Sequence, residues 1–351
     1  MAYTTIDNPE LYFQTKLYTG NGGTQSITLD GSENMQPDWV WLKKRNGTTS
    51  NHFYDSVRGA TNALFSDQSD ATYTASNLLT AFNTDGFTVG NDTGVNNNND
   101  TFVAWNWKAG TSFSNDASAT SVGTIDSAGS VSTTAGFSII SYTGTGSAGT
   151  VAHGLGSTLS LYIVKNRSSG AAWRVFVSSL GADKILRLST THASSTDTNM
   201  WNNTLPTSSI FSIGTPAQVN TSGENYIAYC FAEKKGYSKF GSYTGNGNAD
   251  GTFIYTGFKP AWGIFKRTDN TADWYIYDNK RNTFNVLDDR LEANNSDAEA
   301  ADGGDGNTVD FLSNGFKLRG TGGSMNDGTF IYMCFAESPL VNSNGVPNNA
   351  R

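Results

Sequence analysis

The sequence predicts an all-β protein built of three repeated β-sandwich units in tandem, of the jelly-roll or lectin-like kind. A five-residue turn occurs three times, an apolar run with a basic end follows each copy, and an apolar-aromatic run closes each stretch. Self-similar segments that keep one order along a chain indicate a repeated architecture. The insertions between them are expected in loops.

The turn reads YTGNG at residues 18–22 and 243–247, and YTGTG at 142–146. Glycine supplies turn conformations that a residue with a Cβ would strain. Each copy is therefore predicted to open one β unit.

The second marker is a short apolar run, and it is expected to form a strand. Its copies are WVWLKKR at 39–45, LYIVKNR at 161–167 and AWGIFKR at 261–267. Both faces of the first run are apolar, which predicts a central strand covered on both sides. The final residues Arg45, Arg167 and Arg267 are predicted to be equivalent, with each stem covering the edge of the core.

The third marker closes each unit with FVAWNW at 102–107, YIAYCF at 226–231 and FIYMCF at 330–335. Cys230 and Cys334 occupy the same place in two of these runs. Equivalent positions in different units are poorly placed for a disulfide, so both are predicted to be buried thiols.

The markers divide the chain into six segments. These are an N-terminal arm at 1–15, a first unit at 16–110, a Ser/Thr-rich connector at 111–136, a second unit at 137–236, a third unit at 237–338 and a C-terminal arm at 339–351. Edge strands are the alternative for the end of the connector. In the first arm, Asn8 is expected to cap one helical turn. Both arms are expected to dock on the body of the protein or on a neighbour.

The composition suits many short strands joined by tight turns. Aromatic residues make up 12% of the chain, and there are 38 glycines but only 7 prolines. A net charge of −8 disfavours a nucleic-acid partner. No apolar run approaches the roughly 20 residues that cross a bilayer, and no secretory signal is expected. We therefore expect a soluble product of a cytoplasm.

Two Asp–Arg pairs are predicted to be structural turns held by a charged hydrogen bond. They are Asp55 with Arg58 and Asp278 with Arg281, each pair with the same spacing. In the second unit, Ser178 and Gly181 are expected at the places of the aspartate and the arginine. Contact with a ligand remains the alternative for these turns.

The other candidate sites are weaker. Acidic residues at Asp297, Glu299, Asp302 and Asp305 are expected to form a solvated insertion, with calcium as the alternative and no other cofactor or metal. Trp173, Trp201 and Trp274 lie near predicted loops and are candidates for a glycan platform, with core packing as the alternative. The three histidines are expected in loops or on the surface. No nucleophile motif or paired acids stand out, so the protein is predicted not to be an enzyme.

Together the motifs resemble a group of phage structural proteins. The stretches that carry this resemblance include QPDWVWLKKR, FYDSVRGAT, FNTDGFTVG, GYSKFGSYTGNGNADG and FIYMCFAESP, and it runs from about residue 7 to the C-terminus. Such proteins occur in marine and cyanobacterial tailed phages and are often described as tail or fibre proteins. The resemblance implies a virion component with lectin-like or jelly-roll domains, assembled in the host cytoplasm.

The leading hypothesis is therefore a non-enzymatic structural protein on the exterior of a tailed phage. It would be tail- or fibre-associated, with binding to the host surface as an added role. Capsid decoration as a head-fibre protein, or a carbohydrate-binding adhesin, are the alternatives. The expected partners are other virion proteins, copies of itself and a host surface glycan, without nucleic acid or membrane.

Overall fold

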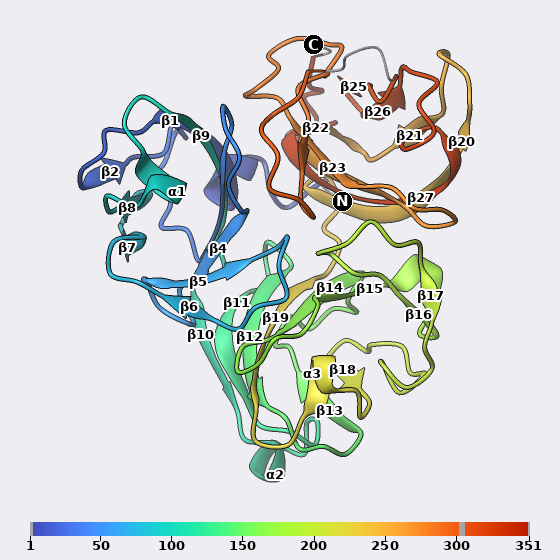
Figure 1. The fold of residues 1–351 in the computed structure, drawn as a ribbon. Helices are drawn as coiled ribbons and strands as arrows, with labels where there is room; N and C mark the ends of the chain where they lie inside the picture. The colour runs from blue at the N-terminus through green and yellow to red at the C-terminus, as the bar shows by residue number, and fades with distance from the viewer. Residues whose placement is uncertain (1–2, 302–305, 350–351) are drawn as a thin grey trace.

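The computed structural model describes residues 3–301 and 306–349, and strands dominate them. The all-β prediction is confirmed. Figure 1 shows the strands in three groups, which we call the first module (β1–β9), the second module (β10–β19) and the third module (β20–β27).

The first module packs a six-stranded sheet, β1-β9-β3-β4-β5-β6, against a three-stranded sheet, β2-β8-β7. Its elements are η1 (Pro9–Leu11), β1 (Phe13–Thr19), β2 (Gln25–Ile27), β3 (Trp39–Lys44), β4 (His52–Asp55), β5 (Asn62–Phe65), β6 (Tyr73–Thr74), β7 (Leu79–Phe82), β8 (Phe87–Val89), α1 (Thr93–Asn96) and β9 (Thr101–Trp107).

The second module has a six-stranded sheet, β10-β11-β12-β19-β14-β15, and two short pairs, β13-β18 and β16-β17. Its elements are β10 (Thr111–Asn115), α2 (Ala117–Thr120), β11 (Ser127–Ser132), β12 (Phe137–Thr143), β13 (Gly149–Ala152), β14 (Leu161–Asn166), β15 (Arg174–Val177), η2 (Ser178–Leu180), β16 (Lys184–Ile185), β17 (Ser195–Thr196), β18 (Ile210–Ile213), α3 (Ala217–Asn220) and β19 (Asn225–Phe231).

The third module packs a five-stranded sheet, β20-β27-β22-β23-β24, against β21-β26-β25. Its elements are β20 (Ser238–Asn246), β21 (Phe253–Tyr255), β22 (Phe258–Arg267), β23 (Trp274–Asp278), β24 (Leu291–Glu292), β25 (Val309–Leu312), β26 (Gly315–Leu318) and β27 (Asp327–Pro339).

The three large sheets contain one common antiparallel order of four strands. It is β1-β9-β3-β4 in the first, β12-β19-β14-β15 in the second and β20-β27-β22-β23 in the third. Each recurring turn ends the first strand of its set, and the other two markers supply the two central strands. The expected central position of residues 39–45 agrees with β3, which lies between β9 and β4.

The register corrects one predicted equivalence. Lys44 pairs with Phe102 and Asn166 with Tyr226, but in the third module it is Arg267 that pairs with the matching Phe330. Arg267 is therefore one position out of step with Arg45 and Arg167. The residue at their position is Thr268, whose N–H donates to Thr329 as those of the two arginines donate to Thr101 and Asn225.

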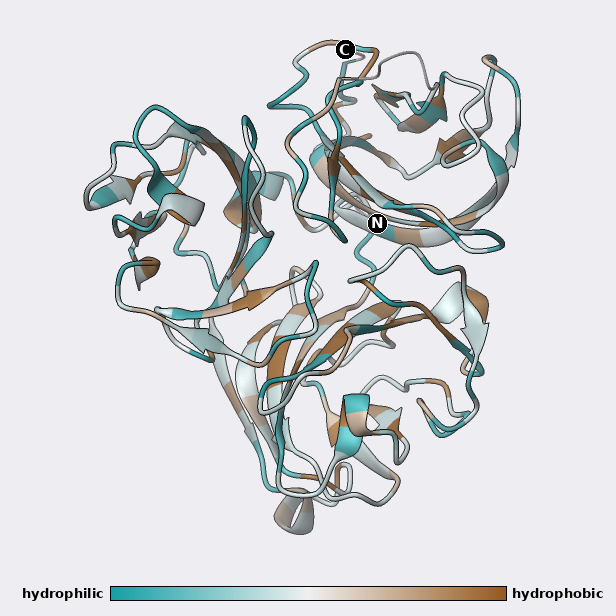
Figure 2. Cartoon of the chain, viewed as in Figure 1, coloured by the Kyte–Doolittle hydropathy of each residue, from teal (hydrophilic) through white to brown (hydrophobic). Residues whose placement is uncertain are grey.

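Each large sheet buries both of its faces. One face packs on the small sheets of its own module, whereas the other faces the remaining two modules. Trp39 lies 4.7 Å from Tyr229 of the second module, and Trp107 lies 5.4 Å from Trp262 of the third, between ring centres. The modules therefore share a central aromatic core. Figure 2 shows hydrophobic residues concentrated along the large-sheet strands and hydrophilic residues in the loops.

The recurring turns are held by a buried asparagine just before each closing strand. Asn96, Asn220 and Asn326 are fully buried, and each side-chain amide bonds backbone groups of its turn. The turn tyrosine hydroxyl donates to the carbonyl of the residue before each asparagine.

Close approach of the backbone explains the first glycine of these turns. A Cβ on Gly144 would lie 2.2 Å from the Thr221 carbonyl oxygen, and Gly146 has a φ of +76°. Only glycine fits the first place without displacing the neighbouring chain.

The segment predicted as a connector, 111–136, is part of a sheet instead. It supplies β10 and β11, which extend the second sheet beyond β12. β11 agrees with the strands expected at the end of this segment, although it lies inside the sheet and not at its edge. β10, at the start of the segment, was missed because short Ser/Thr-rich strands carry little apolar periodicity. β11 is held by six paired positions on β12.

The described residues at the start of the first arm and the C-terminal arm lie on the third module and on each other. The Tyr3 hydroxyl donates to the Gly257 carbonyl at 2.8 Å, the Asn348 amide donates to the Ser313 carbonyl, and Asp7 accepts hydrogen bonds from Ser343. As expected, Asn8 caps the helical turn at Pro9–Leu11. Among the described residues, no helix is long and apolar enough to span a bilayer.

Candidate functional site

The two predicted Asp–Arg turns lie at interfaces between modules, and we call each such interface a seam. The Arg58 Nε donates to Asp55 at 2.5 Å, and neither side chain is exposed. The Arg58 backbone N–H donates to the same carboxylate at 2.8 Å. From the second module, the Tyr229 hydroxyl donates to Asp55 at 2.7 Å. The turn therefore also joins two modules, which the sequence did not reveal.

The third module repeats this arrangement toward the first. Asp278 accepts from the Arg281 Nε at 2.5 Å and from the Trp105 indole at 3.0 Å. Arg281 also donates to Glu299 at 2.9 Å. An Asp–Arg pair with an aromatic donor from the next module thus occurs at two of the three seams.

At the remaining seam, between the second and third modules, the position equivalent to the Asp–Arg pair is apolar. Val177 pairs with Leu161 as Asp55 pairs with Trp39, so Val177 and Leu180 hold the places of the aspartate and the arginine. Met333 of the third module holds the place of Tyr229, and all three contribute to the central core. The alignment with Ser178 and Gly181 was wrong by one position, because the strand register there follows the apolar face.

Three lysines that the sequence analysis did not single out close the ring of modules. Lys43, Lys165 and Lys266 are fully buried, and burial lowers the pKa of each to about 8. Every ammonium donates to a carbonyl of its own module and to one of another module. The acceptors in the other module are 2.9 Å away and belong to Ser296 for Lys43, Ser69 for Lys165 and Thr191 for Lys266.

The direction of these bonds is cyclic. The first module reaches the third, the second reaches the first and the third reaches the second. A lysine inside a run that is apolar on both faces was the available signal, because a buried ammonium needs several acceptors.

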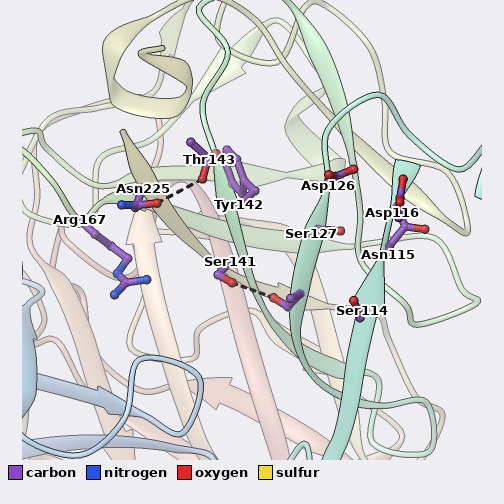
Figure 3. Close-up of a pocket in the computed structure, with 11 residues that line it drawn as sticks. Ser114, Asn115, Asp116, Asp126, Ser127, Ser141, Tyr142, Thr143, Arg167 and Asn225 are labelled. Atoms are coloured by element: carbon purple, nitrogen blue, oxygen red, sulfur yellow. Dashed lines mark hydrogen bonds between the residues drawn. The ribbon is translucent and has the colours of Figure 1, made fainter. Parts of the chain in front are cut away.

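A polar pocket of about 320 Å³ lies on the second module. Figure 3 shows Arg167 at one end, Asp116 and Asp126 at the other, and short hydroxyl and amide side chains between them. The Thr143 hydroxyl donates to the Asn225 amide oxygen at 3.2 Å, which fixes the middle of the pocket.

Residues 8–339 match the family described as a domain of unknown function (DUF7483). The chain belongs to this family. No curated protein matches the chain. The match begins before β1 and ends with β27, so the DUF7483 domain comprises all three modules and their seams.

The glycan-platform prediction for this DUF7483 chain is wrong. Trp173, Trp201 and Trp274 are buried and present no ring face to solvent. Their indole N–H groups donate to the carbonyls of Phe65, Lys184 and Arg187, and the first and last of these bonds cross seams. The residues lie near chain turns, as expected, but those of Trp173 and Trp274 meet another module, and Trp201 is buried in the core of its own module.

Of the four acidic residues of the predicted insertion, two are described by the structure. Asp302 and Asp305 lie outside the described residues. Glu299 is bound by Arg45 at 2.6 Å and by Arg281, and although burial opposes it, these contacts lower its pKa. Asp297 lies beside it on the exposed part of the loop. In the described part of the chain no group of three or more His, Cys, Asp or Glu side chains is placed to hold a metal.

Two histidines and two cysteines are also buried in the interior. His52 and His153 are buried, against expectation, and burial lowers their pKa values to about 3 and about 4. Cys230 and Cys334 are buried free thiols, as predicted, and burial raises both pKa values.

Proposed function

We propose that this chain is a non-enzymatic structural protein on the exterior of a tailed phage virion. In this role it is associated with the tail or a fibre and contacts the host surface. Its resemblance to phage structural proteins supports this proposal, and so does the way in which its polar groups are used.

The observation that carries the proposal is the closed set of seams. Buried Asp–Arg pairs and three buried ammonium groups bond from module to module around one core. Buried charges are costly unless they are fully paired, so these contacts favour a single rigid arrangement. A rigid block of this kind suits a repeated part of a particle.

Capsid decoration is the second candidate, because the threefold character of the ring suits the threefold positions of an icosahedral head as well as a trimeric fibre on a tail. Other virion proteins and further copies of this chain are the partners proposed in either case.

The experiment is cryo-electron microscopy of purified particles from a phage that encodes this chain, with quantitative mass spectrometry of the same sample. We expect density for a three-module ring on the particle surface at many copies per particle. A chain that is produced in infected cells but missing from purified particles would refute the proposal. Density at the tail or at the head decides between the two candidates.

A further inference from the structure

Arg167 stands apart from the other cations of the seams. The structure shows no hydrogen bond or ion pair to its guanidinium from any described residue, and its Nε is buried without a partner although the residue as a whole is only half-buried. The nearest charges are those of Asp55 and Arg58, which already pair with each other. Burial lowers the pKa of Arg167. A buried N–H without an acceptor costs free energy, so an anion bound there would be stabilising.

The first module shows which partner this position takes. Arg45 is at the same place in its sheet as Arg167. Its guanidinium donates two hydrogen bonds to the Glu299 carboxylate, at 2.6 and 2.9 Å. The Glu299 backbone N–H also donates to the Arg45 carbonyl at 2.7 Å. One residue of the neighbouring module thus binds both the backbone and the side chain of Arg45.

At the Arg167 seam the backbone contact is kept and the carboxylate is missing. The Thr72 N–H donates to the Arg167 carbonyl at 3.0 Å, as Glu299 does for Arg45. Threonine cannot supply a carboxylate, and the buried Thr72 hydroxyl has no hydrogen-bond partner among the described residues. Arg167 therefore lacks the carboxylate partner that its equivalent, Arg45, has in Glu299.

At the seam between the second and third modules, no carboxylate is needed because there is no arginine at this position. Thr268 replaces the arginine there, and Ser194 takes the place of Glu299. The Ser194 hydroxyl donates to the Thr268 carbonyl at 2.8 Å. Of the three equivalent places, only that of Arg167 holds a cation without its anion.

We propose that the pocket beside Arg167 binds an acidic saccharide, whose carboxylate pairs with the Arg167 guanidinium as that of Glu299 pairs with the equivalent arginine. A bidentate arginine–carboxylate pair is among the strongest polar contacts and fixes the orientation of its ligand. The hydroxyl groups of the sugar lie against Asn225, Thr143 and Ser141 in the middle of the pocket.

The lining favours a sugar acid over a polyanion. Asp116 and Asp126 lie at the end away from Arg167, where they accept hydrogen bonds from sugar hydroxyls and repel a second negative charge (Figure 3). A neighbouring hollow shares Ala128 and Ser141 with the pocket, so the groove continues toward Ser56 and Val57 of the first module. An oligosaccharide with one acid group at Arg167 fits this distribution of charge.

This site deepens the proposed contact with the host surface and is tested on the purified full-length chain. The probes are a galacturonic acid trimer, glucuronic acid and N-acetylneuraminic acid, compared with a neutral galactose trimer and with acetate by isothermal titration calorimetry. We expect at least one acidic sugar to bind, and to bind at least about tenfold more tightly than the neutral trimer and acetate, which is a difference of about 1.4 kcal/mol.

Two variants locate the site. Arg167→Gln removes the cation, and Thr72→Glu restores an internal carboxylate where Glu299 stands in the equivalent seam. Both should weaken binding of the acidic sugar at least about tenfold. Thr72→Gln is the matched control, which adds the same volume without charge and should retain binding. Thr72→Glu should also raise resistance to urea, because it pairs Arg167 within the chain.

The results that overturn the site are distinct from those that overturn the virion role. Failure of all three acidic sugars to bind, equal binding of acetate, or unchanged binding in Thr72→Glu would each refute the proposal. Urea unfolding of each variant confirms that it is folded. Incorporation into particles is measured separately, so the structural role can stand if the sugar site fails.

Discussion

The seam between the first and second modules allows a sharp test of the ring. Asp55→Asn keeps the shape of the side chain but leaves the Arg58 guanidinium without its carboxylate. Both side chains are fully inaccessible to solvent, so water cannot replace the lost partner. The substitution also weakens the bond from Tyr229 that crosses the seam.

The expected loss in the free energy of unfolding follows from this burial. Removing one partner of a buried ion pair costs about 3–5 kcal/mol, because the other charge stays buried. Folded proteins are stable by only about 5–15 kcal/mol in total. Asp55→Asn should therefore remove about a fifth or more of the free energy of unfolding.

The seam between the second and third modules supplies the design of a variant that should restore stability. There Val177 and Leu180 occupy the equivalent places without any charge. The triple variant Asp55→Val/Arg58→Leu/Tyr229→Phe gives the first seam the same character. Because apolar replacement of a whole buried pair is often close to neutral, it should recover to within about 2 kcal/mol of wild type.

The assay is urea unfolding followed by tryptophan fluorescence. All eight tryptophans are buried, so their emission reports loss of the shared core. The slope of the transition should stay constant while its midpoint moves. A loss of less than about 1 kcal/mol in Asp55→Asn, or a triple variant as unstable as the single one, would refute the reasoning.

Three further outcomes are expected. Gly144→Ala should cost at least about 2 kcal/mol more than Gly170→Ala, because a Cβ at Gly144 lies 2.2 Å from a carbonyl oxygen whereas the nearest atom to a Cβ at Gly170 is 3.8 Å away; equal urea midpoints would contradict this. The buried Lys165 has a pKa of about 8, so the unfolded chain holds this proton up to higher pH than the folded chain. Wild-type stability should therefore rise above pH 8 relative to Lys165→Met, and a constant difference in urea midpoint across that pH would contradict the assignment. Cys230 and Cys334 should react with a thiol reagent only after unfolding, and rapid reaction of the native chain would show that the core opens.

The sequence predicted those features that depend on local pattern. Turns with glycine, short aromatic runs and their fixed order indicated strands and the central position of β3. The Asn8 cap and the buried cysteines followed from similarly local arguments. The strand β10 was missed because small polar residues carry no periodic signal.

The seams could not be predicted because they join residues far apart in the chain. Asp55 and Tyr229 are brought together only by the packing of one sheet on another. The same packing buries Trp173 and Trp274, which the sequence placed near loops. In a single module the second face of each large sheet would meet water, and a pattern that is apolar on both faces cannot say what covers it.

The shared core has a consequence for the order of synthesis. Its last aromatic residue, Phe335, lies on β27 close to the end of the chain. While the first two modules emerge from the ribosome, the wide apolar faces around Trp39 and Trp107 have no third wall. A nascent chain in that state is exposed to aggregation, and a fragment of one or two modules would be as well. The protein is therefore expected to reach its final structure only after translation has passed the last closing strand.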